Sequence, residues 1–321
     1  MKWTKEEVDI LGQYRRTMKS VQNICHDLDN AGFMRTYKAV TRKIESMGWK
    51  RPTDATTMES LPKILLFDIE TTPMPVWVWD FGKQYVPHTN LVRDKYGEQR
   101  AWYILSWAAK WLYDDKVFSD ILKPKEAKNR DDSRILKSIW DMLDEADIVI
   151  AHNGDRFDIR KLNARFIAND MLPPSTYKSI DTLKIARKEF AFSSNKQDFL
   201  TKHFGLAEKL DTDFQLWIDC MNGNSKQLDK MLDYNRRDVV GLEQVYLKLR
   251  PYIKNHPNVG VIMDSNSCPS CGSESLEPLQ ATYFTSSNEF MSYRCNGCGT
   301  PYIRDKSKIS ANGTELRSIA R

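Results

Sequence analysis

The chain has 321 residues, of which 41% are hydrophobic, so it is long enough to form one large buried core and smaller accessory domains. Its longest aliphatic runs, such as residues 64–67 and 148–151, are too short to cross a bilayer, and its first ten residues contain acids where a secretion signal is apolar. The composition therefore argues against a membrane protein and a secreted protein. It predicts a cytoplasmic location.

The net charge of +5 is concentrated in the first 52 residues, which hold eleven Lys and Arg residues against six acidic ones. The rest of the chain is balanced, with 37 residues of each sign. Such an asymmetry favours an anionic partner for the N-terminal segment.

Residues 1–52 carry the signals of three short helices. The sequence TKEE at residues 4–7 is typical of a capping box, in which the side chains of Thr4 and Glu7 each accept the other's backbone N–H. Further helices are predicted to begin at Ser20 and at Thr36, each followed by apolar residues at helical spacing. The basic residues on or beside the third helix are Arg35, Lys38, Arg42 and Lys43.

In general pattern this segment resembles Myb/SANT-like and related helix-turn-helix modules. The opening WTKEE and the candidate recognition helix RTYKAVTRKIESMGW carry the resemblance. It implies that Arg35, Lys38, Arg42 and Lys43 contact nucleic acid. The alternative is a bundle that docks on protein and whose basic face is simply solvated; the concentration of charge favours nucleic acid. Residues 51–60 have the composition of a linker.

Residues 61–255 alternate strand and helix patterns. Apolar runs predict strands over 63–70, 103–112, 116–122 and 147–153. Helical spacing predicts helices over 132–146, 155–169, 182–190, 196–204, 214–222 and 226–253. This order indicates a mixed α/β layer fold. Most of the tryptophans between residues 77 and 111 are expected in the core.

Two acids lie on the first predicted strand, in the sequence FDIETTP. Asp68 and Glu70 are two residues apart, so period-2 alternation places both on one face, with Cα atoms roughly 7 Å apart. Two carboxylates on a core strand need a compensating cation, and Mg²⁺ or Mn²⁺ would supply it. A strand end that simply reaches solvent explains this stretch equally well.

A third acid follows a later strand, in AHNGDRFDIRKL. The strand is predicted to end at His152 and Asn153, and Asp155 is interpreted as the N-cap of the next helix. Asp158 would then face inward beside Phe157, which would anchor the helix to the sheet. Asp158 is thus a candidate third ligand. His152 and Asn153 are candidate substrate contacts or structural polar groups.

The last candidate is YNRRD, near the end of the chain's longest helical pattern. Tyr234 and Asp238 are four residues apart, so on a helix they share a face at about 6 Å. Taken alone, this spacing is more typical of an ordinary solvated face.

In combination and in this order, the motifs Asp-x-Glu, a later Asp and Tyr-xxx-Asp closely resemble the DEDD superfamily of 3′–5′ exonucleases on the ribonuclease H-like fold. Residue 233 is Asp and residue 234 is Tyr, which indicates the tyrosine subtype. The resemblance covers residues 61–255. Within the superfamily, KILLFDIETTP, SSNKQDFLTKHFGL and YNRRDVVGLEQVYLKL look like the predicted polymerase-B-like exonucleases of bacterial viruses and mobile elements.

The resemblance implies a ribonuclease H-like mixed sheet flanked by helices and a two-metal-ion exonuclease. Asp68, Glu70, Asp158 and Asp238 would hold two Mg²⁺ or Mn²⁺ ions, and Tyr234 would orient the attacking water. DNA is favoured over RNA as the substrate. Alternatives are a ribonuclease, an endonuclease or a catalytically silent DNA-binding protein, although none of the acids is missing.

Two further positions precede predicted helices. Asp181 is interpreted as an N-cap, or as a group that supports the metal ligands without being one. Asn195 lies just before another helix, whose N-terminus could receive a phosphate or could be ordinarily capped. Asn153 and Asn195 are therefore predicted to contact the substrate.

Six cysteines occur, and four of them form two CxxC pairs separated by 23 residues. This spacing is typical of a structural zinc site with four thiolates, which we predict at Cys268, Cys271, Cys295 and Cys298. Residues 265–304 are thus interpreted as a zinc ribbon, to which the family resemblance also extends. The ribbon could bind nucleic acid, contact a partner or stabilise the C-terminal region. Cys25 and Cys220 are predicted to be core thiols.

Overall fold

The structure is a computed structural model that describes residues 3–11, 21–46, 62–206, 212–263, 267–285 and 288–307. The chain divides into two units: residues 63–246 form one, and residues 1–62 with 247–321 form the other. The predicted helix start at Ser20 and the predicted linker 51–60 lie outside the described residues. Among the described residues, no helix is both long enough and apolar enough to span a membrane.

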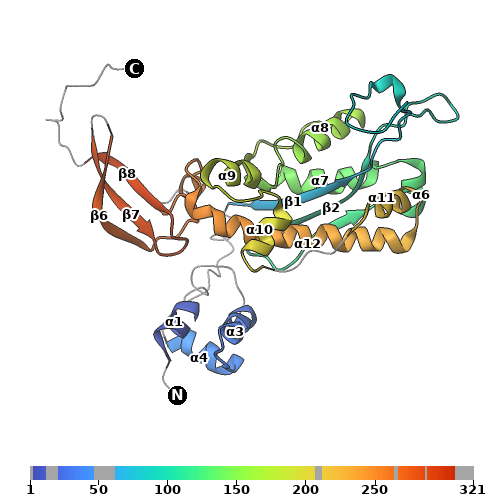
Figure 1. The fold of residues 1–321 in the computed structure, drawn as a ribbon. Coiled ribbons are helices and arrows are strands. Elements are labelled where there is room, and N and C mark those ends of the chain that lie inside the picture. The colour runs from blue at the N-terminus through green and yellow to red at the C-terminus, as the bar shows by residue number, and fades with distance from the viewer. Residues whose placement is uncertain are drawn as a thin grey trace. The chain divides into compact units, whose positions relative to one another are not determined.

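A five-stranded mixed sheet with the order β3-β2-β1-β4-β5 forms the centre of the larger unit (Figure 1). Strand β1 pairs antiparallel with β2 and parallel with β4; β2–β3 is antiparallel and β4–β5 parallel. The strands are β1 Ile64–Thr71, β2 Ile104–Trp111, β3 Phe118–Ile121, β4 Ile148–Ala151 and β5 Lys178–Asp181. The mixed α/β class predicted from the sequence is confirmed.

Helices cover both faces of this sheet because successive strand residues point to opposite sides. On β2, Trp107 faces α7 and donates its indole N–H to the carbonyl of Ile135, whereas Ser106 faces α12 and bonds Asn235. The helices are α6 Pro124–Asn129, α7 Ser133–Asp144, α8 Asp158–Ala168, α9 Thr182–Glu189, α10 Gln197–His203, α11 Phe214–Met221 and α12 Ser225–Leu249, with the short η1 His88–Asn90.

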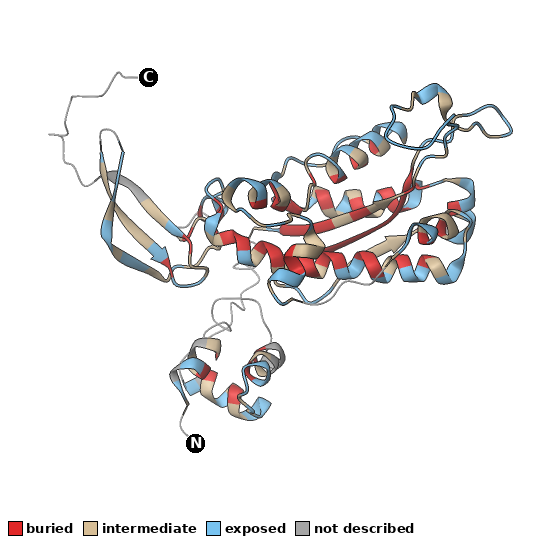
Figure 2. Cartoon of the chain, in the orientation of Figure 1, coloured by how far each residue is buried: buried red, intermediate tan, exposed pale blue. Residues whose placement is uncertain are grey.

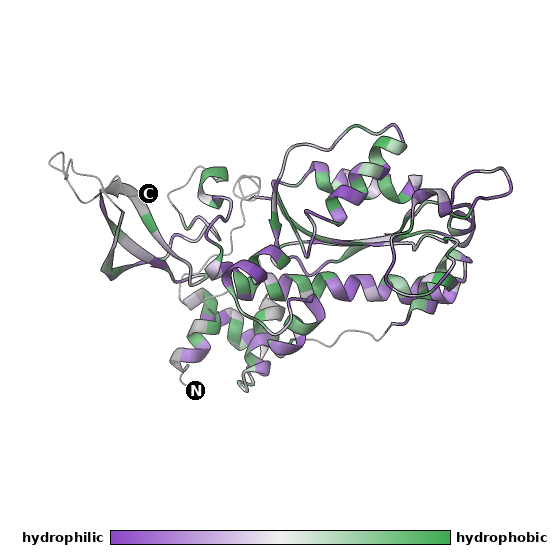
Figure 3. Cartoon of the chain, turned by 45° about the horizontal axis from the view of Figure 1, so that its top comes forward, coloured by the Kyte–Doolittle hydropathy of each residue, from purple (hydrophilic) through white to green (hydrophobic). Residues whose placement is uncertain are grey.

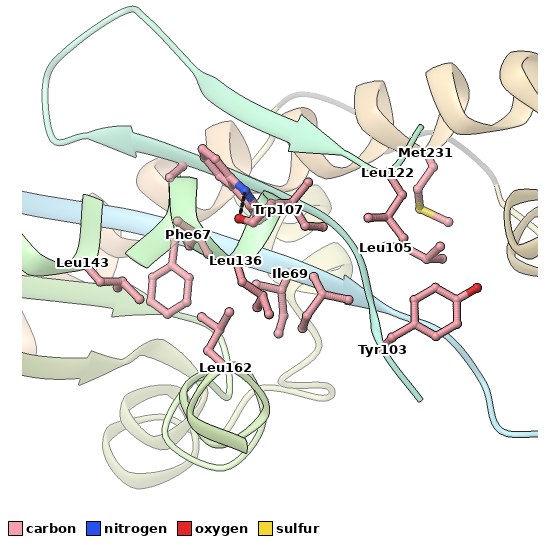
Figure 4. Packing of buried hydrophobic residues seen from close by; sticks show 14 of the residues in the cluster. Phe67, Ile69, Tyr103, Leu105, Trp107, Leu122, Leu136, Leu143, Leu162 and Met231 are labelled. Atoms are coloured by element: carbon pink, nitrogen blue, oxygen red, sulfur yellow. Dashed lines mark hydrogen bonds between the residues drawn. The ribbon is translucent and has the colours of Figure 1, made fainter. Parts of the chain in front are cut away.

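The core between the sheet and α7 and α8 is large and continuous. Figure 4 shows Phe67 among Leu136, Leu143 and Leu162. Each such buried side chain contributes about 1.5–3 kcal/mol. In Figure 2 burial follows β1, β2 and the inner faces of the helices, and in Figure 3 α12 alternates apolar and polar residues along its length. Hydrophobic burial is therefore sufficient to explain why this unit folds.

The entry into α8 differs from the sequence expectation. A turn at residues 153–157 precedes the helix, which begins at Asp158, so Asp155 is not its N-cap. The Asp155 carboxylate instead pairs with Lys184 at 2.6 Å and bonds the Ser179 hydroxyl. Phe157 is exposed and does not anchor the helix. Gly154 permits the turn, since a Cβ there would lie 2.4 Å from that of Ala151.

The described N-terminal residues, 3–11 and 21–46, form three short helices with a small core of their own. These are α1 Lys5–Leu11, α3 Val21–Asn30 and α4 Tyr37–Ser46. The core consists of Leu11, Ile24, Leu28, Val40 and Ile44. The capping box is confirmed: the Thr4 N–H donates to Glu7 at 2.7 Å, and the Glu7 N–H donates to the Thr4 hydroxyl at 3.2 Å.

The C-terminal described residues form an antiparallel sheet of three strands. Its strands are β6 Leu276–Phe284, β7 Glu289–Cys295 and β8 Pro301–Ser307, after η2 Arg250–Tyr252 and α13 Val259–Ile262. No residue of β6 is buried. Within 267–285 and 288–303, the buried residues are Cys268, Ser270, Cys295 and Thr300. This sheet therefore has almost no hydrophobic core.

Candidate active site

Three carboxylates converge where β1 packs against α12. One oxygen each from Asp68, Glu70 and Asp238 lies within 4.8 Å of the other two. The strand period places Asp68 and Glu70 on the face turned to α12, which supplies Asp238. Like charges so close repel one another and favour a cation or a shared proton. Carboxylate oxygens are the ligands that Mg²⁺ and Mn²⁺ prefer, so this donor set fits a divalent metal.

Asn235 holds Asp68 in place, a role that the sequence reasoning missed. Its side-chain N–H₂ donates to the Asp68 carboxylate at 2.7 Å and to the Asp68 carbonyl at 3.3 Å, while its oxygen accepts from the Ser106 hydroxyl at 3.1 Å. Asn235 is fully buried. A signal was present, because Asn235 and Asp238 are three residues apart and share a helix face.

Tyr234 lies one helical turn before Asp238 and is almost buried. Its ring packs edge-on against Trp217, with centroids 6.2 Å apart. Burial, followed by the charges of Asp238, Glu70 and Asp68, raises the pKa of the phenol far above its ordinary value, and the hydroxyl donates a hydrogen bond to Asp238. Tyr234 therefore stays protonated at every ordinary pH and acts as a donor rather than a base.

Asp158 lies beside the backbone of β1 and outside the group of three carboxylates. Its side chain accepts the N–H of Ile69, the residue between the two acids, at 3.2 Å. Strand β4 pairs with β1 only as far as Leu66, which leaves the backbone of β1 beyond Leu66 without a neighbouring strand on that side. The start of α8 covers this part of β1, where Asp158 accepts the Ile69 N–H. Burial, and then the charge of Asp181, raises the pKa of Asp158 to about 7.

A second set of polar groups links the loops around Asp158. Asp181 caps α9, as predicted, and also accepts the N–H of Asn153 at 2.9 Å. The ring of His152 bridges the Thr182 hydroxyl and the carbonyl of Asn195, each at 2.9 Å. The side-chain oxygen of Asn195 is buried and has no hydrogen-bond partner among the described residues. The loops that carry Asn153 and Asn195 are thus tied to one another.

Comparison with protein families gives one match, the RNase H superfamily, over residues 65–250. The match covers more than half of the chain and includes all three carboxylates. The chain belongs to the RNase H superfamily. RNase H-like nucleases use divalent metal ions, which agrees with the acidic donor set.

Among solved structures, a family B DNA polymerase from the hyperthermophilic archaeon Pyrobaculum calidifontis is similar to the chain, with 13% sequence identity and a TM-score of 0.41. The similarity covers 73% of this chain and 33% of the polymerase, so the chain spans about a third of that polymerase's length. A search of curated proteins gave no match.

Outside the RNase H region, the structure gives Arg35 a structural role. Its guanidinium pairs with the buried carboxylate of Glu7 at 2.6 Å and stacks over the ring of Trp3. This pairing lowers the pKa of Glu7 to about 2. Arg35 therefore stabilises the helical bundle, and its side chain is only 14% exposed. On α4, Lys38 and Arg42 are exposed and Lys43 is half-buried.

The four predicted zinc ligands come together in the C-terminal module. The Sγ atoms of Cys268, Cys271, Cys295 and Cys298 all lie within 4.8 Å of one another, with separations of 3.7 Å for Cys268–Cys298 and 3.6 Å for Cys271–Cys295. Four sulfurs at about 2.3 Å from a tetrahedral zinc ion would be about 3.8 Å apart. Gly272 and Gly299 end the two CxxC turns with positive φ and donate to the first cysteine's carbonyl at 2.8 Å. The donor set therefore fits zinc.

Proposed function

We propose that this chain is a metal-dependent 3′–5′ exonuclease of the tyrosine DEDD subtype that hydrolyses phosphodiester bonds of DNA. The observation that carries the proposal is the convergence of Asp68, Glu70 and Asp238 beside the protonated Tyr234. An acid triad is common to many metal sites. The neutral phenol one turn from the last acid is what favours the tyrosine subtype.

Asp68, Glu70, Asp158 and Asp238 would hold two Mg²⁺ or Mn²⁺ ions. Such ions activate water and stabilise the charge that develops on the phosphate. Asp158 would join the other three by turning from the Ile69 N–H, a small change because its carboxylate already lies beside the backbone between Asp68 and Glu70.

The remaining side chains position these groups. Asn235 fixes the Asp68 carboxylate by donating a hydrogen bond to it. Its side-chain oxygen accepts a hydrogen bond from Ser106 on β2. Tyr234 would hold the attacking water in line through the hydroxyl that it places beside Asp238. Asn153 and Asn195 stand on the two linked loops near Asp158, and the buried oxygen of Asn195 gives that loop an unused acceptor for the substrate.

The flanking parts would increase affinity for nucleic acid. We propose residues 1–52 as a helix-turn-helix module of the Myb/SANT type, with Lys38, Arg42 and Lys43 contacting phosphates, and residues 265–304 as a ribbon with one structural Zn²⁺. The exonuclease domain would span residues 61–255. A cytoplasmic location remains part of this proposal.

The test uses single strands of DNA and RNA labelled at either end, with Mn²⁺ present. We expect products from DNA that shorten one nucleotide at a time from the 3′ end, and no products with Asp68→Asn. Internal cuts would indicate an endonuclease, and faster loss of RNA would indicate a ribonuclease. If the unmutated chain cleaves none of the strands, the proposal is wrong.

A further inference from the structure

Between β1 and β2 the chain makes a long excursion that the catalytic proposal does not use. We call residues 73–101 the aromatic arm. Its described structure consists of the short helix η1 and two isolated bridges, Val76–Leu91 and Arg93–Gln99. A segment of this length with so little regular structure is uncommon in a compact unit and is usually functional.

The arm presents its aromatic side chains to solvent. Trp79 and Phe81 are almost fully exposed, at 101% and 97%, and three more rings are largely exposed: Trp77, Tyr85 and Tyr96. The later tryptophans differ, because Trp107 is buried and Trp102 and Trp111 pack on the core. The sequence expectation that most tryptophans are core thus holds outside the arm. A large group of exposed rings marks an interaction surface.

A basic pocket of about 160 Å³ lies at the base of the arm. Arg100 of the arm, Lys128 and Arg130 line it, together with Asn222. The Arg130 guanidinium donates to the carbonyl of Ala101 at 2.5 Å and lies over the ring of Tyr103, which fixes its position.

No described carboxylate neutralises these three cations through an ion pair. The Asp94 charge reaches Arg100 and Arg130, but its carboxylate accepts the backbone N–H groups of Tyr96 and Glu98, each at 2.9 Å. Burial, with a contribution from the charge of Arg100, lowers the pKa of Arg130. An anion that enters the pocket would offset this repulsion.

The arm and the pocket are at the same end of the sheet as the carboxylates. Thr72, two residues after Glu70, donates its N–H to the carbonyl of Tyr103 in the pocket wall at 3.0 Å. Met221, which also lines the pocket, follows Cys220, whose thiol is influenced by the charge of Glu70. A strand bound at the carboxylates therefore reaches this surface within a few nucleotides.

We propose that the aromatic arm and the basic pocket bind an unpaired segment of the nucleic-acid substrate, with bases stacked on the exposed rings and a backbone phosphate in the pocket. The inference rests on the proposed nuclease function. Rings alone would also suit a protein partner, but rings beside an unneutralised cationic pocket match a single strand, which presents aromatic faces and phosphates together. Paired bases are not free to stack on the arm.

The test measures binding of the full chain in the Asp68→Asn background, where the substrate stays intact. Fluorescence anisotropy measures binding to a labelled single strand and to a blunt duplex of equal length. Two double variants are compared with the parent: one carries Trp79→Ala and Phe81→Ala, and the other carries Arg100→Glu and Lys128→Glu. Loss of one stacked ring weakens single-strand binding by roughly 5- to 150-fold. We expect at least tenfold weaker single-strand binding for each pair, little change for the duplex, and a shallower salt dependence for the charge reversals.

Matched controls are Phe214→Ala with Tyr252→Ala, which removes exposed rings from α11 and η2, and Lys178→Glu on β5. Neither should change the preference for single strands. If both arm variants bind the single strand as the parent does, the inference is overturned, and a protein partner becomes the explanation of the arm.

A cleavage assay on a dinucleotide separates this inference from the proposed function. A dinucleotide is too short to reach the pocket. When the arm substitutions are made in the chain that keeps Asp68, we therefore expect the variants to cleave the dinucleotide at the normal rate. If the parent cleaves nothing while the arm variants bind the single strand more weakly, the proposed nuclease function is refuted and the proposed binding surface is supported. Arm variants that lose dinucleotide cleavage would show instead that the arm acts on the catalytic centre, contrary to the inference.

Discussion

The two groups of candidate metal ligands differ in what supports them. Asp68, Glu70 and Asp238 stand on a strand and a helix whose inner faces are buried in a continuous core. The four cysteines stand on two turns beside a sheet in which β6 has no buried residue. The first group is positioned by packing that exists without metal. The second has little besides the metal to hold it.

This contrast assigns different roles to the two metals. In the acidic group a metal would supply chemistry, and the packing of the fold would hold three negative charges together. In the cysteine group a metal would supply folding energy, of the order found in other structural zinc modules. Removing each metal should therefore have opposite consequences for stability and activity.

The largest effect is expected from loss of the cysteine site. Cys295→Ser, or a chelator, removes about 10–16 kcal/mol of binding energy that stabilises residues 267–307. Amide hydrogen exchange should show loss of protection throughout β6, β7 and β8, while β1 and α12 stay protected. The control Cys25→Ser removes a thiol outside the group. Retained protection of β7 in the metal-free chain would contradict the contrast.

Asp68→Asn should have the converse effect. A metal stabilises a phosphoryl transition state by several kcal/mol, so we expect cleavage to fall by about a thousandfold or more. The melting temperature of the larger unit should stay the same or rise, because one of three like charges is removed. The exposed Asp233→Asn on α12 is the matched control. A lowered melting temperature with normal cleavage would reverse the assignment.

Tyr234→Phe tests the positioning role within the acidic site. The phenol is protonated, so its loss removes a donor but no charge. We expect the maximal rate to fall by about a hundredfold while Mn²⁺ affinity and the substrate KM change little. The pH–rate profile should keep its shape, since no group that titrates in the ordinary range is lost. Equal rates for mutant and parent across pH would reduce Tyr234 to a packing residue.

A smaller effect is expected from Asn235→Ala, which frees Asp68 without removing a ligand. Outer groups of this kind change metal affinity by about 10-fold or somewhat more. The variant should also lose about 1–3 kcal/mol of stability because the Ser106 hydroxyl is left buried without its partner. Titration calorimetry with Mn²⁺ and thermal unfolding measure the two effects. Unchanged metal affinity would mean that Asp68 needs no support from α12.

The smallest effect concerns the N-terminal bundle. The pKa of Glu7 is lowered from 4.5 to about 2 by Arg35, so the pair stabilises the bundle above pH 4.5 and this contribution is lost as pH falls towards 2. The indole resonance of Trp3, which lies under Arg35, should shift over this range in NMR spectra. Glu7→Gln should abolish that shift. An identical titration in both proteins would show that another group is responsible.

The sequence predicted β1 to β4 and most helices of residues 61–255 because their apolar spacing follows the period of each element. The cysteine spacing and the Asp-x-Glu strand were informative for the same reason, since local geometry alone places those side chains together. The error at Asp155 arose in a turn, where Gly154 delays the helix by three residues. Local spacing does not specify how many residues a turn uses.

Other features depend on partners that are distant in the chain. Arg35 looked like a surface cation because Glu7, its partner, is 28 residues away. Asn235 was overlooked because its hydrogen bonds join residues more than a hundred positions apart. The exposure of Trp79 could not be predicted from the sequence either, because tryptophan side chains are usually buried. In each case tertiary packing decides the role of the residue.

The most direct test of the account is the binding of Mn²⁺ in crystals of the full chain, located by anomalous scattering. The account predicts an anomalous peak between the carboxylates of Asp68, Glu70 and Asp238, with the positions of β1 and α12 unchanged from crystals without Mn²⁺. The peak should be absent in Asp68→Asn. Saturating Mn²⁺ with no peak at these carboxylates, or a peak that forms only after β1 and α12 rearrange, would contradict a metal site built on a preformed fold.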